Sequence, residues 1–329
     1  MERFFRNALD FQLVDGTVVP LRFSKAQMAY FEPTPYKFRS YNAAGICLDF
    51  ITDSPFFRIS FRVKLKPGTS ERLYFDIFVD DQLVSFPAVL ISGKGTGDWT
   101  AELPICKGQP RRVTVYLPYQ ARIAVERMNV AEGSLWEPAE PYGKNLLCLG
   151  DSITQGMSAA HPSSTYTVLL SRFLEMNLLN QAVSGYVFDP ETIDPELPYR
   201  PDLITVAYGT NDWTVIDSHE RFEERASAYI RKLTEMYPSV PITVLSPVWR
   251  EDCDHVKRTG SFADIHDTIE RICRGFETVR FIPGLKLTPH HPAFFTDGLH
   301  PNDEGFLHMA MNVLKLGLLH HEKSSLARS

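Results

Sequence analysis

The hydrophobic pattern of this chain differs between its two halves, and that difference restricts the fold more than any other feature of the sequence. Alternation of apolar and polar residues is clearest in the stretch Phe57, Arg58, Ile59, Ser60, Phe61, Arg62, Val63, Lys64 and Leu65. A period of two places one face of a strand on a core and the other face in water. Further short runs of this kind, separated by turn signals such as residues 80–82, predict an antiparallel β-sandwich.

The second half instead contains short runs that are apolar throughout. These runs occupy residues 146–149, 178–183, 203–207, 242–245 and 279–282. Between them, apolar residues recur at helical spacing, as in residues 166–174, 222–233 and 265–272. Strands that are apolar on both faces and alternate with helices predict a parallel sheet covered on both sides, which is a three-layer α/β/α domain.

Residues 131–141 read Ala-Glu-Gly-Ser-Leu-Trp-Glu-Pro-Ala-Glu-Pro and mark the change. Two prolines and a glycine in so short a segment are typical of an extended linker. We therefore predict a sandwich domain at residues 1–135 and an α/β domain at residues 136–329, and a chain of 329 residues is long enough for both.

Charge and composition exclude several classes of function. The formal net charge of −6 disfavours nucleic acid as a partner, because phosphate binding needs a positive surface. No run of about eighteen apolar residues is present, so we expect no membrane partner. No CxxC or HExxH pattern occurs, and we expect neither a metal nor a cofactor.

The cysteines and the N-terminus predict the compartment. Five scattered cysteines, an odd number, suit reduced and buried thiols better than a disulfide framework. The chain opens without the apolar segment of a secretory signal. Both features predict a cytoplasmic protein.

Four polar segments follow predicted strands of the second half or lie beyond the last one. They are Gly150-Asp151-Ser152, Ala182-Val183-Ser184-Gly185, Gly209-Thr210-Asn211-Asp212 and Asp297-Gly298-Leu299-His300-Pro301. In a parallel sheet, ligands bind in the crevice beyond the carboxyl ends of the strands. We therefore expect these segments to converge although they lie far apart in the sequence.

In order and spacing, these four segments resemble the motif blocks of the SGNH hydrolases, also called the GDSL esterase/lipase superfamily. The resemblance covers residue 144 to the C-terminal helix, and it implies a flavodoxin-like domain. The chain as a whole resembles bacterial carbohydrate esterases that carry an N-terminal, jelly-roll-like β-sandwich. The GxSxG motif of the α/β-hydrolases is absent around Ser152, which separates the two fold families.

The resemblance implies a role for each block. Ser152 becomes the nucleophile, His300 the general base and Asp297 its orienting acid. The oxyanion donors become the backbone N–H groups of Ser152 and Gly185 and the side-chain amide of Asn211. This chemistry needs such residues, because a serine hydroxyl is a weak nucleophile until an imidazole takes its proton, and N–H donors must stabilise the oxyanion.

Simpler interpretations compete with these roles. Ser152 could cap a helix and Asn211 could hold a turn. Trp213, Trp249 and Arg250 follow two of the strands, where they are candidates for substrate binding; ordinary packing of the two large rings is an equal alternative.

The leading hypothesis is a cytoplasmic serine esterase that removes O-acetyl groups from oligosaccharides or a related small-molecule ester. Within the same superfamily, a lipase or lysophospholipase, a thioesterase and an acyltransferase stay open. From another class, a carbohydrate-binding protein with a degenerate hydrolase domain is the rival. The sandwich is a candidate for the rim of the active site or for a homo-oligomer interface.

Overall fold

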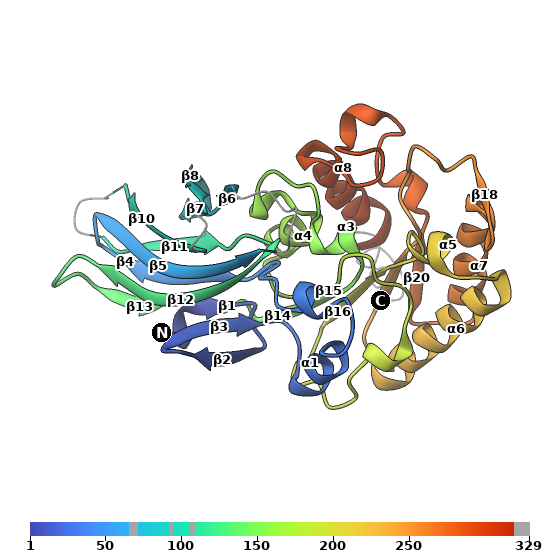
Figure 1. Ribbon diagram of the computed structural model, residues 1–329, viewed down its shortest axis with the longest axis horizontal. Coiled ribbons are helices and arrows are strands. Elements are labelled where there is room, and N and C mark those ends of the chain that lie inside the picture. Colours follow the sequence, from blue (N-terminus) through green and yellow to red (C-terminus); the bar gives the residue numbers. More distant parts are fainter. Residues whose placement is uncertain (66–71, 92–94, 105–108, 319–329) are drawn as a thin grey trace, which may run out of the picture. The chain divides into compact units, whose positions relative to one another are not determined.

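The computed structural model describes residues 1–65, 72–91, 95–104 and 109–318 (Figure 1). The chain forms two compact units. The first comprises Met1–Gly143 together with Ala160–Ser163 and Asn177–Leu179, and the second comprises the rest of the chain. Of the five cysteines, Cys106 lies outside the described residues, and the thiols of the other four are free.

The first unit is built from two antiparallel sheets, as the alternating pattern predicts. One sheet has the order β1 (Phe5–Arg6), β4 (Cys47–Thr52), β11 (Arg111–Tyr116), β7 (Asp76–Val79) and β8 (Gln82–Ser85). The other has the order β10 (Thr96–Glu102), β5 (Phe56–Leu65), β12 (Ala121–Val130), β3 (Thr17–Leu21) and β2 (Asp10–Val14). Leu48 and Val115 of the first sheet share one apolar core with Ile59 and Ile123 of the second.

Smaller elements complete this unit. They are η1 (Glu2–Phe4), α1 (Lys25–Phe31), α2 (Lys37–Ser40) and the strand pair β6 (Arg72–Tyr74) and β9 (Ala88–Leu90). The turn predicted at residues 80–82 joins β7 to β8. Asp80 and Asp81 both adopt positive φ there, 45° and 64°, the conformation that a tight hairpin turn of this hand requires.

The division between the units follows Gly143, and not residue 135 as the linker composition predicted. Strand β13 (Trp136–Pro138) pairs with β4, and the Trp136 ring stacks on Phe4 with 4.3 Å between centroids. The proline-containing segment is therefore an added strand of the sandwich, because its tryptophan is covered by the first unit.

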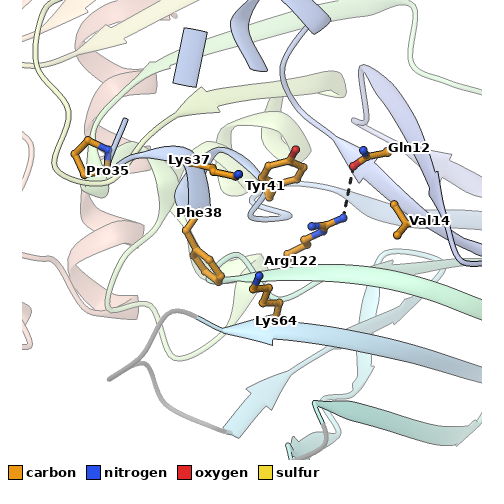
Figure 2. Close-up of a pocket in the computed structure, with 8 residues that line it drawn as sticks. All are labelled: Gln12, Val14, Pro35, Lys37, Phe38, Tyr41, Lys64 and Arg122. Atoms are coloured by element: carbon orange, nitrogen blue, oxygen red, sulfur yellow. Dashed lines mark hydrogen bonds between the residues drawn. The ribbon is translucent and has the colours of Figure 1, made fainter. Parts of the chain in front are cut away.

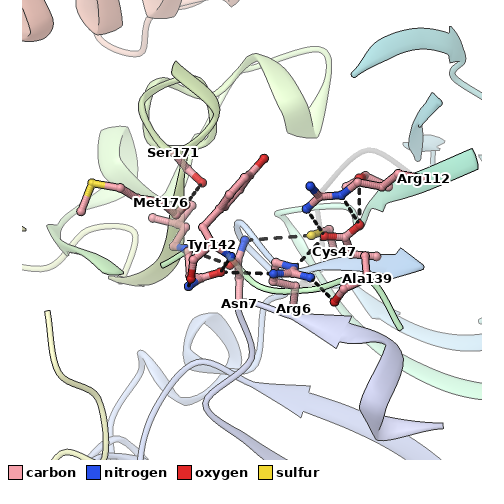
Figure 3. Close-up of polar contacts among 12 residues, drawn as sticks. Arg6, Asn7, Cys47, Arg112, Ala139, Tyr142, Ser171 and Met176 are labelled. Carbon is pink, nitrogen blue, oxygen red and sulfur yellow. Dashed lines mark hydrogen bonds and ion pairs between the residues drawn. The ribbon is translucent and has the colours of Figure 1, made fainter. Parts of the chain in front are cut away.

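Asp49 on β4 joins two arginines from the neighbouring strands of its sheet. Its side chain is only 2% exposed. Arg112 of β11 donates through Nε and Nη2 to both carboxylate oxygens, at 2.9 and 2.7 Å. Arg6 of β1 places Nε 2.6 Å from Asp49 Oδ2 and donates through Nη2 to the Ala139 carbonyl (Figure 3). One carboxylate thus neutralises two partly buried guanidinium groups.

We expect Asp49→Ala to lower the free energy of unfolding by about 3–5 kcal/mol, because it leaves buried positive charge without a partner. Glu126→Ala is the matched control. Glu126 pairs with Arg62, but both side chains are well exposed, so its loss should change stability by about 1 kcal/mol or less. Urea unfolding of both variants measures the difference. Equal effects would show that the Asp49 cluster does not stabilise the sandwich.

The second unit contains the predicted parallel sheet. Its order is β15 (Met176–Ala182), β14 (Lys144–Gly150), β16 (Leu203–Ala207), β17 (Ile242–Leu245) and β20 (Val279–Ile282). The chain therefore proceeds in one direction from β14 to β15 and in the other from β16 to β17 and β20. Because parallel crossovers are right-handed, the helices of these two connections cover opposite faces.

The helices follow this rule. The first connection carries α3 (Ser152–Gln155) and α4 (Tyr166–Leu174), and α4 packs against the C-terminal α8 (Asp303–Val313). The later connections carry α5 (Asp212–Val215), α6 (His219–Met236) and α7 (Phe262–Cys273), of which α6 packs against α7. The remaining elements are η2 (Pro162–Ser164), η3 (Pro190–Thr192), the strand pair β18 (Val256–Lys257) and β19 (Gly260–Ser261), η4 (Gly284–Lys286), η5 (Pro292–Phe294) and η6 (Leu314–Leu318). Among the described residues, no helix has both the length and the apolar character needed to cross a bilayer.

Candidate active site

Ser152 lies on a tight turn between the end of β14 and the start of α3. Asp151 caps the helix, because its Oδ1 accepts a hydrogen bond of 2.9 Å from the Ile153 backbone N–H. Only glycine fits at position 150, because neighbouring atoms leave no room for a side chain. A Cβ at this position would lie 2.1 Å from Thr154 Oγ1 and 2.7 Å from the Ala207 carbonyl oxygen. The turn therefore fixes the direction in which the Ser152 side chain leaves the sheet.

His300 and Asp297 form one hydrogen-bonded loop before α8. Asp297 Oδ1 accepts from the backbone N–H groups of Leu299 and His300, and Asp297 Oδ2 lies 2.8 Å from His300 Nδ1. On the other side of the ring, His300 Nε2 lies 2.9 Å from Ser152 Oγ. With Nδ1 donating to the carboxylate, Nε2 is the nitrogen that can accept a hydrogen bond from the Ser152 hydroxyl, and this order of contacts is the one found in Ser–His–Asp triads.

The charge of Asp297 supports this arrangement. Partial burial by itself would raise the pKa of the Asp297 carboxyl, but the hydrogen bonds from the backbone and ring of His300 outweigh it and lower that pKa below its ordinary value. The carboxylate is therefore ionised at neutral pH.

Asn211 connects the two other motif blocks. It follows β16, and its Nδ2 donates to the Tyr186 carbonyl at 2.9 Å and to Asp151 Oδ2 at 3.3 Å. Tyr186 is the neighbour of Gly185, which adopts a φ of 82°, and Asp151 is the neighbour of Ser152. The amide of Asn211 thus lies between the Gly185 turn and the Ser152 turn.

Three residues that we did not single out as site residues hold these turns in place. The Gln155 side chain accepts from the Ser184 N–H at 2.8 Å. Asp212 accepts from the N–H groups of Phe188 and Gly209, and Asp151 accepts from Ile153 and Asn211. Burial raises the pKa of Asp151 to about 7 and that of Asp212 to about 6. The sequence did offer a sign of this supporting role, because Asp151 and Asp212 both lie within the motif blocks.

The structure places Trp213 and Arg250 in the interior. The Trp213 side chain is 0% exposed, its Nε1 donates to the Gly260 carbonyl, and the Arg250 guanidinium lies 5.0 Å from the ring centroid. Arg250 itself pairs with Asp252 and donates to the Thr210 carbonyl. These side chains brace the segment that carries Asn211. The Trp213 side chain is fully covered, whereas the Arg250 side chain keeps 11% of its surface, and substrate binding by Arg250 stays a prediction.

Trp249 is partly buried and lies beside the loop that carries Asp297 and His300. Its ring centroid is 4.9 Å from that of Phe295, which forms a β-bridge with Pro301. The Glu251 N–H donates to the Gly298 carbonyl at 2.7 Å, so this segment also supports the loop. Among the residues that the structure describes, no group of three His, Cys, Asp or Glu side chains could hold a metal ion.

Comparison with solved structures identifies the architecture. A salicylyl-acyltransferase from a tetracycline biosynthetic pathway matches with a TM-score of 0.82 and 22% identity, covering 96% of this chain and 95% of that one. A putative GDSL-like lipase from Bacteroides ovatus matches with a TM-score of 0.73 and 20% identity, covering 95% of each chain. A family two carbohydrate esterase from Clostridium thermocellum, solved with cellohexaose, matches with a TM-score of 0.64 and 13% identity, covering 84% of this chain and 94% of that one. At these identities the likeness concerns the fold.

Comparison of the sequence with known proteins and families adds to this. A search of curated proteins finds no match for the chain. A family model does match, and its span includes all four motif blocks and the first turn of α8. The resemblance predicted from the motifs is confirmed: residues 148–306 match the GDSL-like Lipase/Acylhydrolase family.

Proposed function

We propose that this protein is a serine esterase that uses Ser152, His300 and Asp297 to cleave O-acyl esters of carbohydrates. The family match supports an ester-hydrolysing enzyme. The observation that carries the finer proposal is the unbroken hydrogen-bonded path from Asp297 Oδ2 through both ring nitrogens of His300 to Ser152 Oγ. A serine nucleophile needs a base within hydrogen-bond reach, and a carboxylate on the far side of the ring orients that base.

In the acylation step, His300 Nε2 takes the proton from Ser152 Oγ as the oxygen attacks the ester carbonyl. The carbonyl oxygen becomes negative in the tetrahedral state. We assign its stabilisation to the N–H groups of Ser152 and Gly185 and to Asn211 Nδ2, whose 3.3 Å contact with Asp151 is long enough to yield to a better acceptor. The imidazolium then protonates the departing alcohol oxygen, and the acyl group stays on Ser152.

Deacylation repeats the sequence with water. His300 Nε2 takes a proton from a water molecule as it attacks the acyl carbonyl, and the second tetrahedral state collapses by expelling Ser152 Oγ. The imidazolium returns its proton to that oxygen. One ester and one water give one acid and one alcohol, and the enzyme is restored.

The proposal of a carbohydrate substrate is supported by the fold shared with the family two carbohydrate esterase that was solved with cellohexaose, and the acetyl group stays a prediction from the sequence. Trp249 stays a candidate for the wall of the substrate site, because it packs beside the loop of Asp297 and His300. The cytoplasmic location and the homo-oligomer stay predictions, and so does the expectation of neither a nucleic-acid nor a membrane partner.

Acyl transfer is the second candidate function, favoured by the likeness to the salicylyl-acyltransferase along nearly the whole chain. In that reaction a bound alcohol takes the place of water in deacylation, and His300 removes the proton of the alcohol instead. Product analysis with an added acceptor alcohol separates the two functions. A new ester in excess of free acid supports transfer, and free acid alone supports hydrolysis.

A serine-directed phosphonate should form a covalent adduct on Ser152, and Ser152→Ala should abolish it, because only an activated hydroxyl attacks phosphorus readily. Intact-mass and peptide mass spectrometry locate the adduct. Ser158→Ala, which removes a nearby hydroxyl outside the triad, is the control and should keep the label. Tight glycan binding without any labelling would instead support the carbohydrate-binding alternative with a degenerate hydrolase domain.

Asn211→Ala should lower kcat by about 10²–10³ with a smaller change in KM, because the lost donor acts mainly on the oxyanion. Asn145→Ala is the matched control. Asn145 lies at the opposite end of β14, where its side chain donates to the Arg200 carbonyl, so its removal should leave kcat unchanged. Steady-state kinetics on a soluble acetyl ester provide the comparison. A kcat for Asn211→Ala within about twofold of wild type would remove Asn211 from the oxyanion hole.

If the acetyl assignment is right, kcat/KM should be higher for p-nitrophenyl acetate and acetylated xylo-oligosaccharides than for octanoyl and palmitoyl esters. A pocket shaped for a methyl group offers no favourable surface to a long chain. Faster turnover of the long-chain esters would favour a lipase, a lysophospholipase or a thioesterase.

A further inference from the structure

The first unit holds a cavity of about 520 Å³ that is lined by cations and aromatic rings (Figure 2). Lys64 reaches it from β5, Arg122 from β12 and Gln12 from β2, while Lys37, Phe38 and Tyr41 contribute from α2 and its C-terminal neighbour. Its volume is within the range that holds a small organic ligand. None of the residues of the candidate triad lines this cavity.

Two of the cations of the cavity, Arg122 and Lys64, lie opposite each other on neighbouring strands. Arg122 lies directly opposite Lys64 in the antiparallel register of β12 and β5, so both side chains project from the same face of the sheet. Like charges at directly opposite positions destabilise a sheet. Within the described ranges, neither side chain has a carboxylate at ion-pair distance. An anion bound between them would remove this repulsion.

Of two neighbouring acids, one pairs with Lys37 of the cavity, and within the described residues neither forms an ion pair with Arg122 or Lys64. Glu32 pairs with Lys37 at the surface, where both side chains are about half exposed. Asp15 lines an adjoining depression of about 220 Å³, which also includes Lys64 and Arg122. Among the residues that the structure describes, the lining of the main cavity contains three cations and no acid.

Arg122 contacts an aromatic ring and an amide in the cavity. Its guanidinium carbon lies 4.6 Å from the centroid of the Tyr41 ring, and its Nη2 lies 3.5 Å from Gln12 Oε1. A guanidinium stacked on an aromatic ring keeps its edge available, and that edge matches the two oxygens of a carboxylate. Phe38 adds an apolar surface to the same cavity.

We propose that this cavity is a binding site for a small ring-bearing carboxylate, with Arg122 and Lys64 holding the carboxylate and Phe38 contacting the ring. A uronate of an acidic oligosaccharide and an aromatic acid both have this chemistry. The site goes beyond the proposed esterase, and no catalytic step uses its residues. Failure of this proposal therefore leaves the proposed function standing, and the converse also holds.

Titration calorimetry on the full chain tests the site with four probes at low salt. The probes are a glucuronate-bearing xylo-oligosaccharide, the neutral xylo-oligosaccharide of the same length, benzoate and inorganic phosphate. At least one of the two ring acids should bind about tenfold or more tightly than the neutral sugar and phosphate, and higher salt should weaken it. Comparison of the glucuronate-bearing sugar with benzoate shows whether the ligand is a uronate or an aromatic acid.

The double variant Lys64→Gln/Arg122→Gln should weaken binding of that acid by about tenfold or more. Arg58→Gln is the matched control: it removes a charge from the same face of β5 outside the cavity, and it should leave the affinity unchanged. Without ligand, the double variant should unfold at the same urea concentration as wild type or a higher one, because the like-charge pair is gone. Absence of binding by both acids, equal binding of phosphate or the neutral sugar, or full affinity in the double variant would each overturn the proposal.

Discussion

The candidate site depends on one constraint, which is that β14 and β16 run parallel and end at the same edge of the sheet. Their register pairs Gly150 with Ala207, so the turns after these strands begin side by side. As a result, Asn211 Nδ2 reaches Asp151 Oδ2, one residue before the proposed nucleophile. His300 is positioned differently, by a loop closed through its own hydrogen bonds to Asp297 and supported by Glu251. The sheet positions Ser152 and Asn211, and the loop positions the ring of His300.

This convergence places carboxyl groups in a region of low polarity. Asp151 and Asp212 are buried, and their oxygens accept hydrogen bonds from N–H groups that would otherwise point into the turns without a partner. Burial nevertheless outweighs those bonds and raises the pKa of both acids. Hydrogen bonds to the two acids therefore hold the turns in shape, while burial of the same acids disfavours their charged forms. Such a combination is common where a fold is shaped by function as well as by stability. The low pKa of Asp297 has the opposite cause, since the hydrogen bonds from His300 there outweigh a smaller loss of solvation.

The sequence predicted the sheets well because buried strands leave a local signature. All five apolar runs of the second half are strands, and the alternation in residues 57–65 matches β5. Contacts between residues that lie far apart in the sequence leave no such local pattern. Trp213 follows a motif block but its ring is covered by Phe262, Arg250 and Lys257, which come from later segments. Likewise, nothing local to residues 136–138 indicates that β4 has an open edge for them, and the Asp49 cluster combines residues from three separate strands.

The Asp49 cluster and the cavity around Arg122 show two outcomes for positive charge on the same sandwich. In the cluster, Arg6 and Arg112 share one buried carboxylate that the chain supplies from the strand between them. In the cavity, Arg122 and Lys64 are direct cross-strand neighbours, and the described chain places no carboxylate between them. Arg122 instead contacts an aromatic ring and an amide. A protein acid between Arg122 and Lys64 would compete with a carboxylate ligand. Contacts that leave the charge of Arg122 unpaired therefore suit a site that binds such a ligand.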